Sequence, residues 1–197
     1  MKKIMFLCLA VLFLLPFSTE AKSAKKTNTD IYQNEQYNFQ INLPSGWITS
    51  FMQENDVVLK TSSVTSEGAV GTIAIYAKNL ANSPHTDYNQ IEPHIMQTLV
   101  DDAVTKVKNE KTLVNMRYAR YININGNRFV VLYYTFGSDN DKMDIITATT
   151  VVNSTEYNIL LETNDYTDSM IDQYYQSLTS FNTLTKTDNT ASKDESQ

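Results

Sequence analysis

The sequence predicts an α+β domain in which an antiparallel β-sheet has helices packed on both faces, an α/β/α sandwich. The pattern of residues 113–162 predicts four antiparallel strands, and the Asn125-Gly126 pair between two of them suits a type I′ hairpin turn. Apolar stripes at helical spacing flank this region, at 93–108 and 168–181. Strands of the region carry apolar residues on both faces, which indicates packing partners on both sides of the sheet.

The domain is predicted to open with a strand that ends at a tight turn. Apolar residues alternate with polar ones along this strand, at Tyr37, Phe39, Ile41 and Leu43. Pro44 cannot donate a ladder hydrogen bond and Gly46 tolerates positive φ, so the strand should end there. We expect it to form an edge of the same sheet, with Trp47 as a core or lid residue.

We expect a single domain over residues 36–181. Between its opening strand and the first helix, further strands are predicted at 48–53, 57–61 and 71–77, with a polar loop at 62–68. Residues 22–35 are predicted to be a flexible leader and residues 182–197 a disordered tail, because both segments are polar and lack periodicity.

The first 21 residues have the layout of a cleavable secretory signal peptide. Lys2 and Lys3 form a basic start, residues 4–17 form an apolar run, and Thr19 and Ala21 offer small side chains before the cleavage point. The run is shorter than the ~20 residues that span a bilayer. We therefore expect an exported protein, periplasmic or secreted, with an uncleaved N-terminal anchor as the open alternative.

Charge and cysteine content exclude several classes of function. Cys8, the only cysteine, lies inside the apolar run, so the mature chain has no thiol for a disulfide, a metal site or a nucleophile. Lipidation is not expected, because a lipoprotein cysteine follows the apolar run. The formal net charge is −6 at pH 7, so an extended nucleic-acid-binding surface is not expected either.

No set of residues predicts catalysis. The two histidines, His85 and His94, flank the start of the main helix, where a surface or capping role is favoured. The chain has no Gly-x-Ser-x-Gly motif, and its glycine cluster at 68–71 lacks the lysine and helix of a phosphate-binding loop. Glu156 and Glu162 share a strand face by parity and could act as a glycosidase pair only if folding brought them together.

Two groups of residues could bind a metal ion. Residues 139–144 place three aspartates, Asp139, Asp141 and Asp144, in a turn, but the glycine and the glutamate that an EF-hand loop needs are absent. His85, Glu92 and His94 could bind zinc if the chain brought His85 round. A solvated loop and a surface helix end are the favoured interpretations, and no cofactor is expected.

Tyrosines are concentrated in the predicted meander, together with the three arginines of the chain. Tyrosine suits a half-buried sheet, which is the favoured interpretation. The alternative is a binding face with arginine anchors. The tyrosines are Tyr118, Tyr121, Tyr133, Tyr134 and Tyr157, and the arginines are Arg117, Arg120 and Arg128.

Three ordered motifs resemble those of the PsbP/DcrB/Mog-like superfamily. They are the opening Tyr37-x-Phe39-x-Ile41-x-Leu43-Pro44-x-Gly46-Trp47, the Asn125-Gly126 hairpin, and the last strand at 156–161 followed by a helix closing in Ser177-Leu178-Thr179-Ser180-Phe181. The resemblance covers about residues 36–181. It implies an antiparallel sheet between helices and a non-catalytic binding or assembly role. The signal peptide argues against the cytoplasmic and nuclear roles of that superfamily.

The sequence therefore favours an exported, non-catalytic binding or assembly module of the bacterial cell envelope. We assign no catalytic, cofactor-binding or metal-binding residue. The expected partner is another envelope protein rather than nucleic acid, and no stable membrane span is expected after signal cleavage. Two alternatives stay open: a periplasmic protein that binds a small ligand or a divalent metal, and an envelope hydrolase whose acidic residues converge in space.

Overall fold

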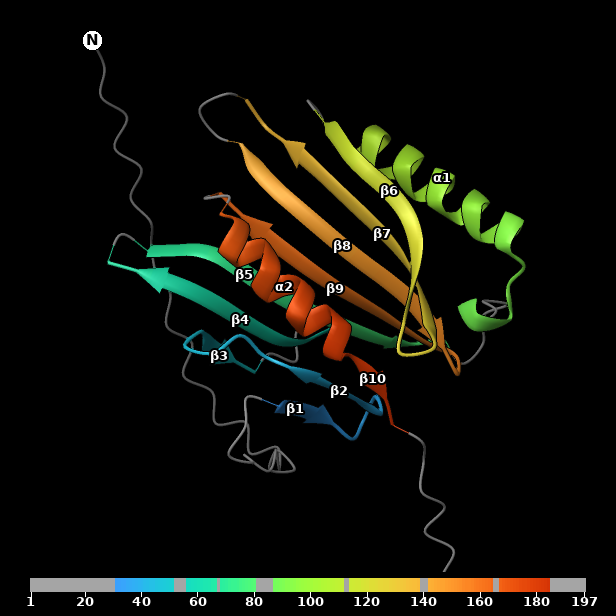
Figure 1. The fold of residues 1–197 in the computed structure, drawn as a ribbon, viewed down its shortest axis with the longest axis horizontal. Coiled ribbons are helices and arrows are strands. Elements are labelled where there is room, and N and C mark those ends of the chain that lie inside the picture. Colours follow the sequence, from blue (N-terminus) through green and yellow to red (C-terminus); the bar gives the residue numbers. More distant parts are fainter. Residues whose placement is uncertain are drawn as a thin grey trace, which may run out of the picture.

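The computed structural model describes residues 31–51, 56–66, 68–80, 87–111, 114–138, 142–164 and 167–184. These residues form two antiparallel sheets, two α-helices and one 3-10 turn (Figure 1). The strands are β1 (Ile31–Asn34), β2 (Phe39–Asn42), β3 (Ile48–Ser50), β4 (Val57–Thr65), β5 (Gly68–Asn79), β6 (Asn115–Ile124), β7 (Asn127–Phe136), β8 (Met143–Val152), β9 (Thr155–Thr163) and β10 (Asn182–Thr183). The helices are η1 (Tyr88–Gln90), α1 (Pro93–Glu110) and α2 (Asp168–Ser180).

Seven strands form the large sheet, in the order β3-β4-β5-β9-β8-β7-β6. The run β6-β7-β8-β9 is the meander that the sequence predicts, and β9 then pairs with β5. The β6–β7 hairpin turns at Asn125 and Gly126, whose φ angles are 49° and 82°. The Asn125 side chain also donates to the backbone oxygens of Thr179 and Phe181. The predicted hairpin is therefore confirmed, and it also holds the end of α2.

Helices lie against both faces of the large sheet. Figure 1 shows α2 crossing in front of β9, while α1 lies along β6 and β7. Helix α1 begins with Pro93, where the missing N–H costs no hydrogen bond. Helix α2 begins after Thr167, whose side chain accepts from the backbone N–H of Met170. The α+β class with helices on both faces is thus observed.

The small sheet has the order β1-β2-β10 and joins α2 on the same side of the large sheet. Its core contribution is aromatic: Phe39 stacks on Phe181 with ring centroids 5.7 Å apart, and Tyr157 and Phe129 meet the same Phe181 ring edge-on. All four rings are buried. Aromatic pairs at these distances stabilise by about 0.5–1.5 kcal/mol beyond their burial, so this cluster fastens the small sheet to the large one.

The structure differs from the prediction at both ends of the domain. Strand β1 lies inside residues 22–35, predicted as a flexible leader, and β10 lies inside residues 182–197, predicted as a disordered tail. Both pair with β2, which is the centre of a separate sheet rather than an edge of the main one. Residues 62–68, predicted as a polar loop, mostly continue β4 and begin β5.

Neither of the two described α-helices is long and apolar enough to cross a bilayer. The predicted signal peptide, residues 1–21, lies outside the described residues.

Candidate functional site

The two faces of the large sheet differ in how completely they are covered. We call the side under α2 and the small sheet the closed face. Its side chains on β4, β5, β8 and β9 are fully or almost fully buried: Leu59, Thr61, Ile73, Ile75, Ile146, Ala148, Ile159 and Leu161. On the other side, α1 packs on β6 and β7. The strands beyond α1 present a partly exposed surface that we call the open face.

The open face is mostly polar. It is made by alternate residues of the same four strands, of which Ala74, Ile145 and Val151 are buried. The residues in contact with solvent are Lys60, Ser62, Thr72, Tyr76, Thr147, Thr149, Glu156, Asn158, Leu160 and Glu162. Lys60 and Glu162 are exposed, and the others are half-buried. A polar, partly exposed sheet face of this kind can bind a partner or ligand without disturbing the core.

A pocket of about 250 Å³ lies on the open face where the sheet meets the end of α1. Its walls come from one helix end and four strands: Tyr76, Lys111, Tyr134, Phe136, Ile145, Thr147, Asn158, Leu160 and Glu162. A second depression of about 210 Å³ adjoins it and shares Tyr76 and Asn158. Its other lining residues are Asp56, Ala77, Lys78 and Glu156.

Strand register explains why these side chains meet. Glu162 on β9 pairs with Ile145 on β8, which pairs with Tyr134 on β7, so the three form one row across the sheet. Asn158 pairs with Tyr76 on β5 and lies four residues before Glu162 on the same face. Period-two alternation therefore places the acid, the amide and both tyrosines in one pocket.

Two tyrosines and two residues of opposite charge, Lys111 and Glu162, line the pocket. Burial raises the pKa of Tyr76 and Tyr134 above the usual value, and the Glu162 carboxylate raises both further. The Lys111 ammonium lies 5.0 Å from the centroid of the Phe136 ring, a cation–π contact. Within the described part of the chain, Glu162 and Lys111 form no ion pair with each other or with another residue.

Asn158 contributes an unsatisfied acceptor. Its Oδ1 atom is shielded from solvent and has no hydrogen-bond partner among the residues that the structure describes. A buried acceptor without a donor costs about 1–3 kcal/mol. The Asn χ2 torsion is broad, so a modest rotation would offer this amide to a donor in the pocket.

The acidic pair considered for glycosidase chemistry is too widely spaced. Glu156 and Glu162 do share the open face, in the second depression and the pocket respectively. Six residues of strand separate them, or about 20 Å. Glycosidase carboxyl groups lie about 5–9.5 Å apart, so these two do not form such a pair.

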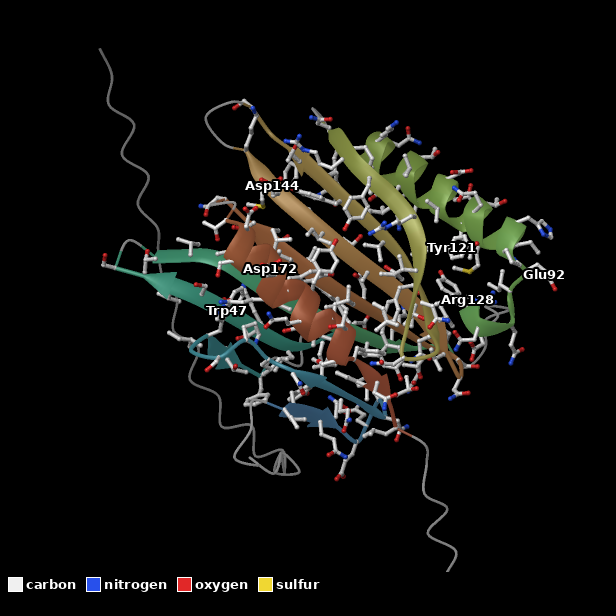
Figure 2. The ribbon with its side chains drawn as sticks, viewed as in Figure 1. Trp47, Glu92, Tyr121, Arg128, Asp144 and Asp172 are labelled. Atoms are coloured by element: carbon white, nitrogen blue, oxygen red, sulfur yellow. The ribbon has the colours of Figure 1, made fainter. Side chains whose placement is uncertain are left out.

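Neither predicted metal arrangement is assembled in the described residues. No group of three or more His, Cys, Asp or Glu side chains lies together in that part of the chain. His85, Asp139 and Asp141 fall outside the described residues. Glu92 and His94 are exposed at the start of α1, and the Asp144 carboxylate accepts from the Tyr133 hydroxyl at 3.2 Å (Figure 2).

The meander tyrosines do not form one binding face. Tyr118, Tyr133 and Tyr157 pack with the closed-face core, whereas Tyr121 and Tyr134 pack on the α1 side. The arginines are also divided. Arg117 and Arg120 are exposed on β6, whereas the partly buried Arg128 guanidinium donates to the backbone oxygen of Ile91. The half-buried-sheet interpretation fits this arrangement.

Trp47 has a structural contact. Its indole N–H donates to the Gln173 side chain on α2 at 2.8 Å, and its half-buried ring packs against the closed-face core (Figure 2). The Pro44–Gly46 turn makes this possible, since Gly46 has φ of 79°. Trp47 therefore joins the turn between β2 and β3 to α2, and it is not part of the pocket lining.

Sequence reasoning did not single out Tyr76, Lys111 or Asn158. A signal was present on β9, where Glu156, Asn158 and Glu162 alternate with apolar residues. That alternation marks a strand with one wet face.

Comparison with known proteins identifies the fold. No protein-family model and no curated protein matches the sequence. Among solved structures, cyanobacterial PsbP (CyanoP) from Synechocystis sp. PCC 6803 matches with a TM-score of 0.56 at 13% identity, over 86% of this chain and 99% of that one. LpqN of Mycobacterium tuberculosis, described as involved in cell envelope biogenesis, matches with a TM-score of 0.57 at 10% identity, over 82% and 88%.

A protein from Bacteroides thetaiotaomicron also matches, with a TM-score of 0.50 at 9% identity, over 81% of this chain and 50% of that one. At such identities the likeness concerns the fold alone. The resemblance seen in the Pro44–Trp47 turn, the Asn125-Gly126 hairpin and the Ser177–Phe181 helix end is confirmed at that level. The chain has a PsbP-like fold.

Proposed function

We propose that this protein is an exported, non-catalytic binding module of the bacterial cell envelope that engages its partner through the open face. The observation that carries the proposal is the contrast between the faces of one sheet. The closed face is filled by α2 and the small sheet, whereas the strands beyond α1 keep polar side chains and a pocket available. Antiparallel sheets often keep one face in contact with solvent, and on this sheet the solvated part also carries the pocket.

Two further points support the proposal. The N-terminal segment has the layout of a signal peptide, and LpqN, which shares the fold, is described as involved in cell envelope biogenesis. Glu156 and Glu162 are too far apart for paired-carboxylate chemistry, which removes one basis for the hydrolase alternative. The proposed partner is another envelope protein.

Site-specific photocrosslinking in the host bacterium tests the proposal. A photoreactive residue replaces Lys60, exposed on the open face outside the pocket, and a matched variant carries it at Asp172, exposed on the outer side of α2 (Figure 2). We expect a discrete adduct with an envelope protein from position 60 and none from position 172. Equal adducts from both positions, or none from position 60, would contradict the proposal.

A further inference from the structure

The pocket beside α1 holds one positive and one negative group that do not neutralise each other. Lys111 and Glu162 both line it, yet no ion pair joins them in the described residues. Lys111 instead lies over the Phe136 ring. Opposite charges on the walls of one pocket suit a ligand that carries both complementary charges.

The spacing of the two groups limits the ligand. Phe136, beneath Lys111, is on β7, and Glu162 is on β9. Strand β8 lies between them, so the two strand axes are about 10 Å apart. Phe136 also lies two residues beyond Tyr134, the residue in register with Glu162, so the Cα atoms of Phe136 and Glu162 are about 12 Å apart. Each ligand charge lies about 2.8 Å from its protein partner, which leaves about 6 Å between the two ligand charges. The ammonium and carboxylate of a free amino acid share one carbon atom and are closer together than this. The termini of a peptide of two or three residues are better matched.

The rest of the lining suits a peptide backbone. Tyr76, Tyr134 and Phe136 supply aromatic walls for small apolar side chains. Asn158 supplies an amide whose Oδ1 lacks a donor within the described residues and which, after rotation about χ2, can accept from a peptide N–H. The Thr147 hydroxyl can donate or accept at the same pocket. Each group thus has a counterpart in a short peptide.

We propose that this pocket binds a short peptide with free termini, its ammonium group toward Glu162 and its carboxylate toward Lys111. The inference rests on the proposed function of the open face as a binding surface, and it names one class of ligand for it. Both charged side chains are exposed. Each of the two ion pairs between peptide and protein therefore changes the affinity by up to about fivefold, and binding is weak.

A titration followed by amide NMR of the mature protein tests the inference. Trialanine is the probe, with N-acetyl-trialanine, trialanine amide and free alanine as comparison ligands. We expect trialanine to shift amide signals around Ile145–Thr147 and Asn158–Glu162, and each blocked peptide and free alanine to bind severalfold more weakly. Equal binding of trialanine and both blocked peptides, or shifts confined to α2, would overturn the inference.

Two variants assign the orientation. Glu162→Gln should abolish the difference between trialanine and its N-acetyl form, and Lys111→Gln should abolish the difference between trialanine and its amide. Lys106→Gln, on the exposed side of α1 and outside the pocket lining, is the matched control and should leave both differences intact. Persistence of both differences in the two pocket variants would contradict the assignment.

These results separate the two proposals. If trialanine causes no shifts while the Lys60 crosslink persists, the peptide inference fails and the open face remains a protein-binding surface. If trialanine binds as described but no crosslink forms, the envelope-protein partner is wrong and the peptide site stands.

Discussion

The two faces of the seven-stranded sheet are formed by alternate residues of the same strands. Ile146 and Ala148 on β8 are fully buried under α2, whereas their neighbour Thr147 is half-buried beside the pocket. Along β9, Ile159 and Leu161 are buried, whereas Glu162 is exposed. The alternation gives one parity the fully buried side chains that stabilise the fold, whereas the other parity includes the polar side chains that stay in contact with solvent.

The largest expected effect is at the aromatic centre of the closed face. Phe181→Ala removes a fully buried ring that contacts Phe39, Phe129 and Tyr157. It should lower the free energy of unfolding by about 3–5 kcal/mol, measured by urea denaturation. Phe136→Ala, a half-buried ring in the pocket, is the comparison and should cost clearly less. Equal losses of unfolding free energy in Phe181→Ala and Phe136→Ala would contradict the distinction between the closed and the open face.

Neighbouring residues of β8 give a sharper test. Ala148→Val adds two methyl groups where the side chain is fully buried, and overpacking should cost about 1–3 kcal/mol. Thr147→Val changes the open face and should alter stability by no more than about 0.5 kcal/mol. Valine suits a strand better than alanine and about as well as threonine, so a loss of stability in Ala148→Val would come from overpacking and not from β-propensity. Thermal and urea unfolding measure the stability of both variants. A larger loss of stability in Thr147→Val than in Ala148→Val would contradict the comparison.

A smaller effect concerns pH. Burial raises the pKa of Tyr174 well above its usual value of 10.0, and nearby Tyr118 adds to the rise. The unfolded chain loses this proton near pH 10 and the folded chain keeps it, so the associated stability is complete below pH 10 and is lost as the pH rises above it. We expect the free energy of unfolding of Tyr174→Phe to fall less steeply above pH 10 than that of the wild type.

Tyr174→Phe also removes the hydroxyl that donates to the Ile159 oxygen at 2.9 Å, which lowers stability by about 1–2 kcal/mol at neutral pH. Tyr76→Phe is the control from the open face. The pKa of Tyr76 is raised as well, but its ring is only half-buried, so its removal should change the alkaline slope less. Equal slopes for the wild type and Tyr174→Phe would show that burial of this hydroxyl does not control alkaline stability.

The sequence predicts the meander and both helices because their signals are local. The Asn125-Gly126 turn requires positive φ, and the apolar stripes of α1 and α2 repeat within a few residues. The β4–β5 hairpin is longer than predicted because residues 62–65 have a loop-like composition and yet pair with residues 68–72. The Ser62 and Thr72 hydroxyls, for example, lie 3.1 Å apart. Local composition thus concealed a strand with a polar face.

The small sheet and the pocket depend on contacts that no local pattern encodes. Gln40 pairs with Gln33 and also with Asn182, which follows it by most of the length of the domain. Lys111 and Glu162 line the same pocket only because α1 packs along β6 and β7 and ends beside the sheet. The sequence shows that Asn158 and Glu162 share one face of a strand, but it does not show which residues lie beside them on the neighbouring strands.

The pairing of β10 with β2 has a consequence for when the protein can fold. The closed face needs Phe181, and the small sheet needs Asn182–Thr183, so the core is completed by the C-terminal end of the described chain. Contacts so distant in sequence form slowly, because a long loop must close first. A nascent chain therefore lacks its final core until translation has passed this point, and the domain completes its fold only after almost all of its residues have been synthesised.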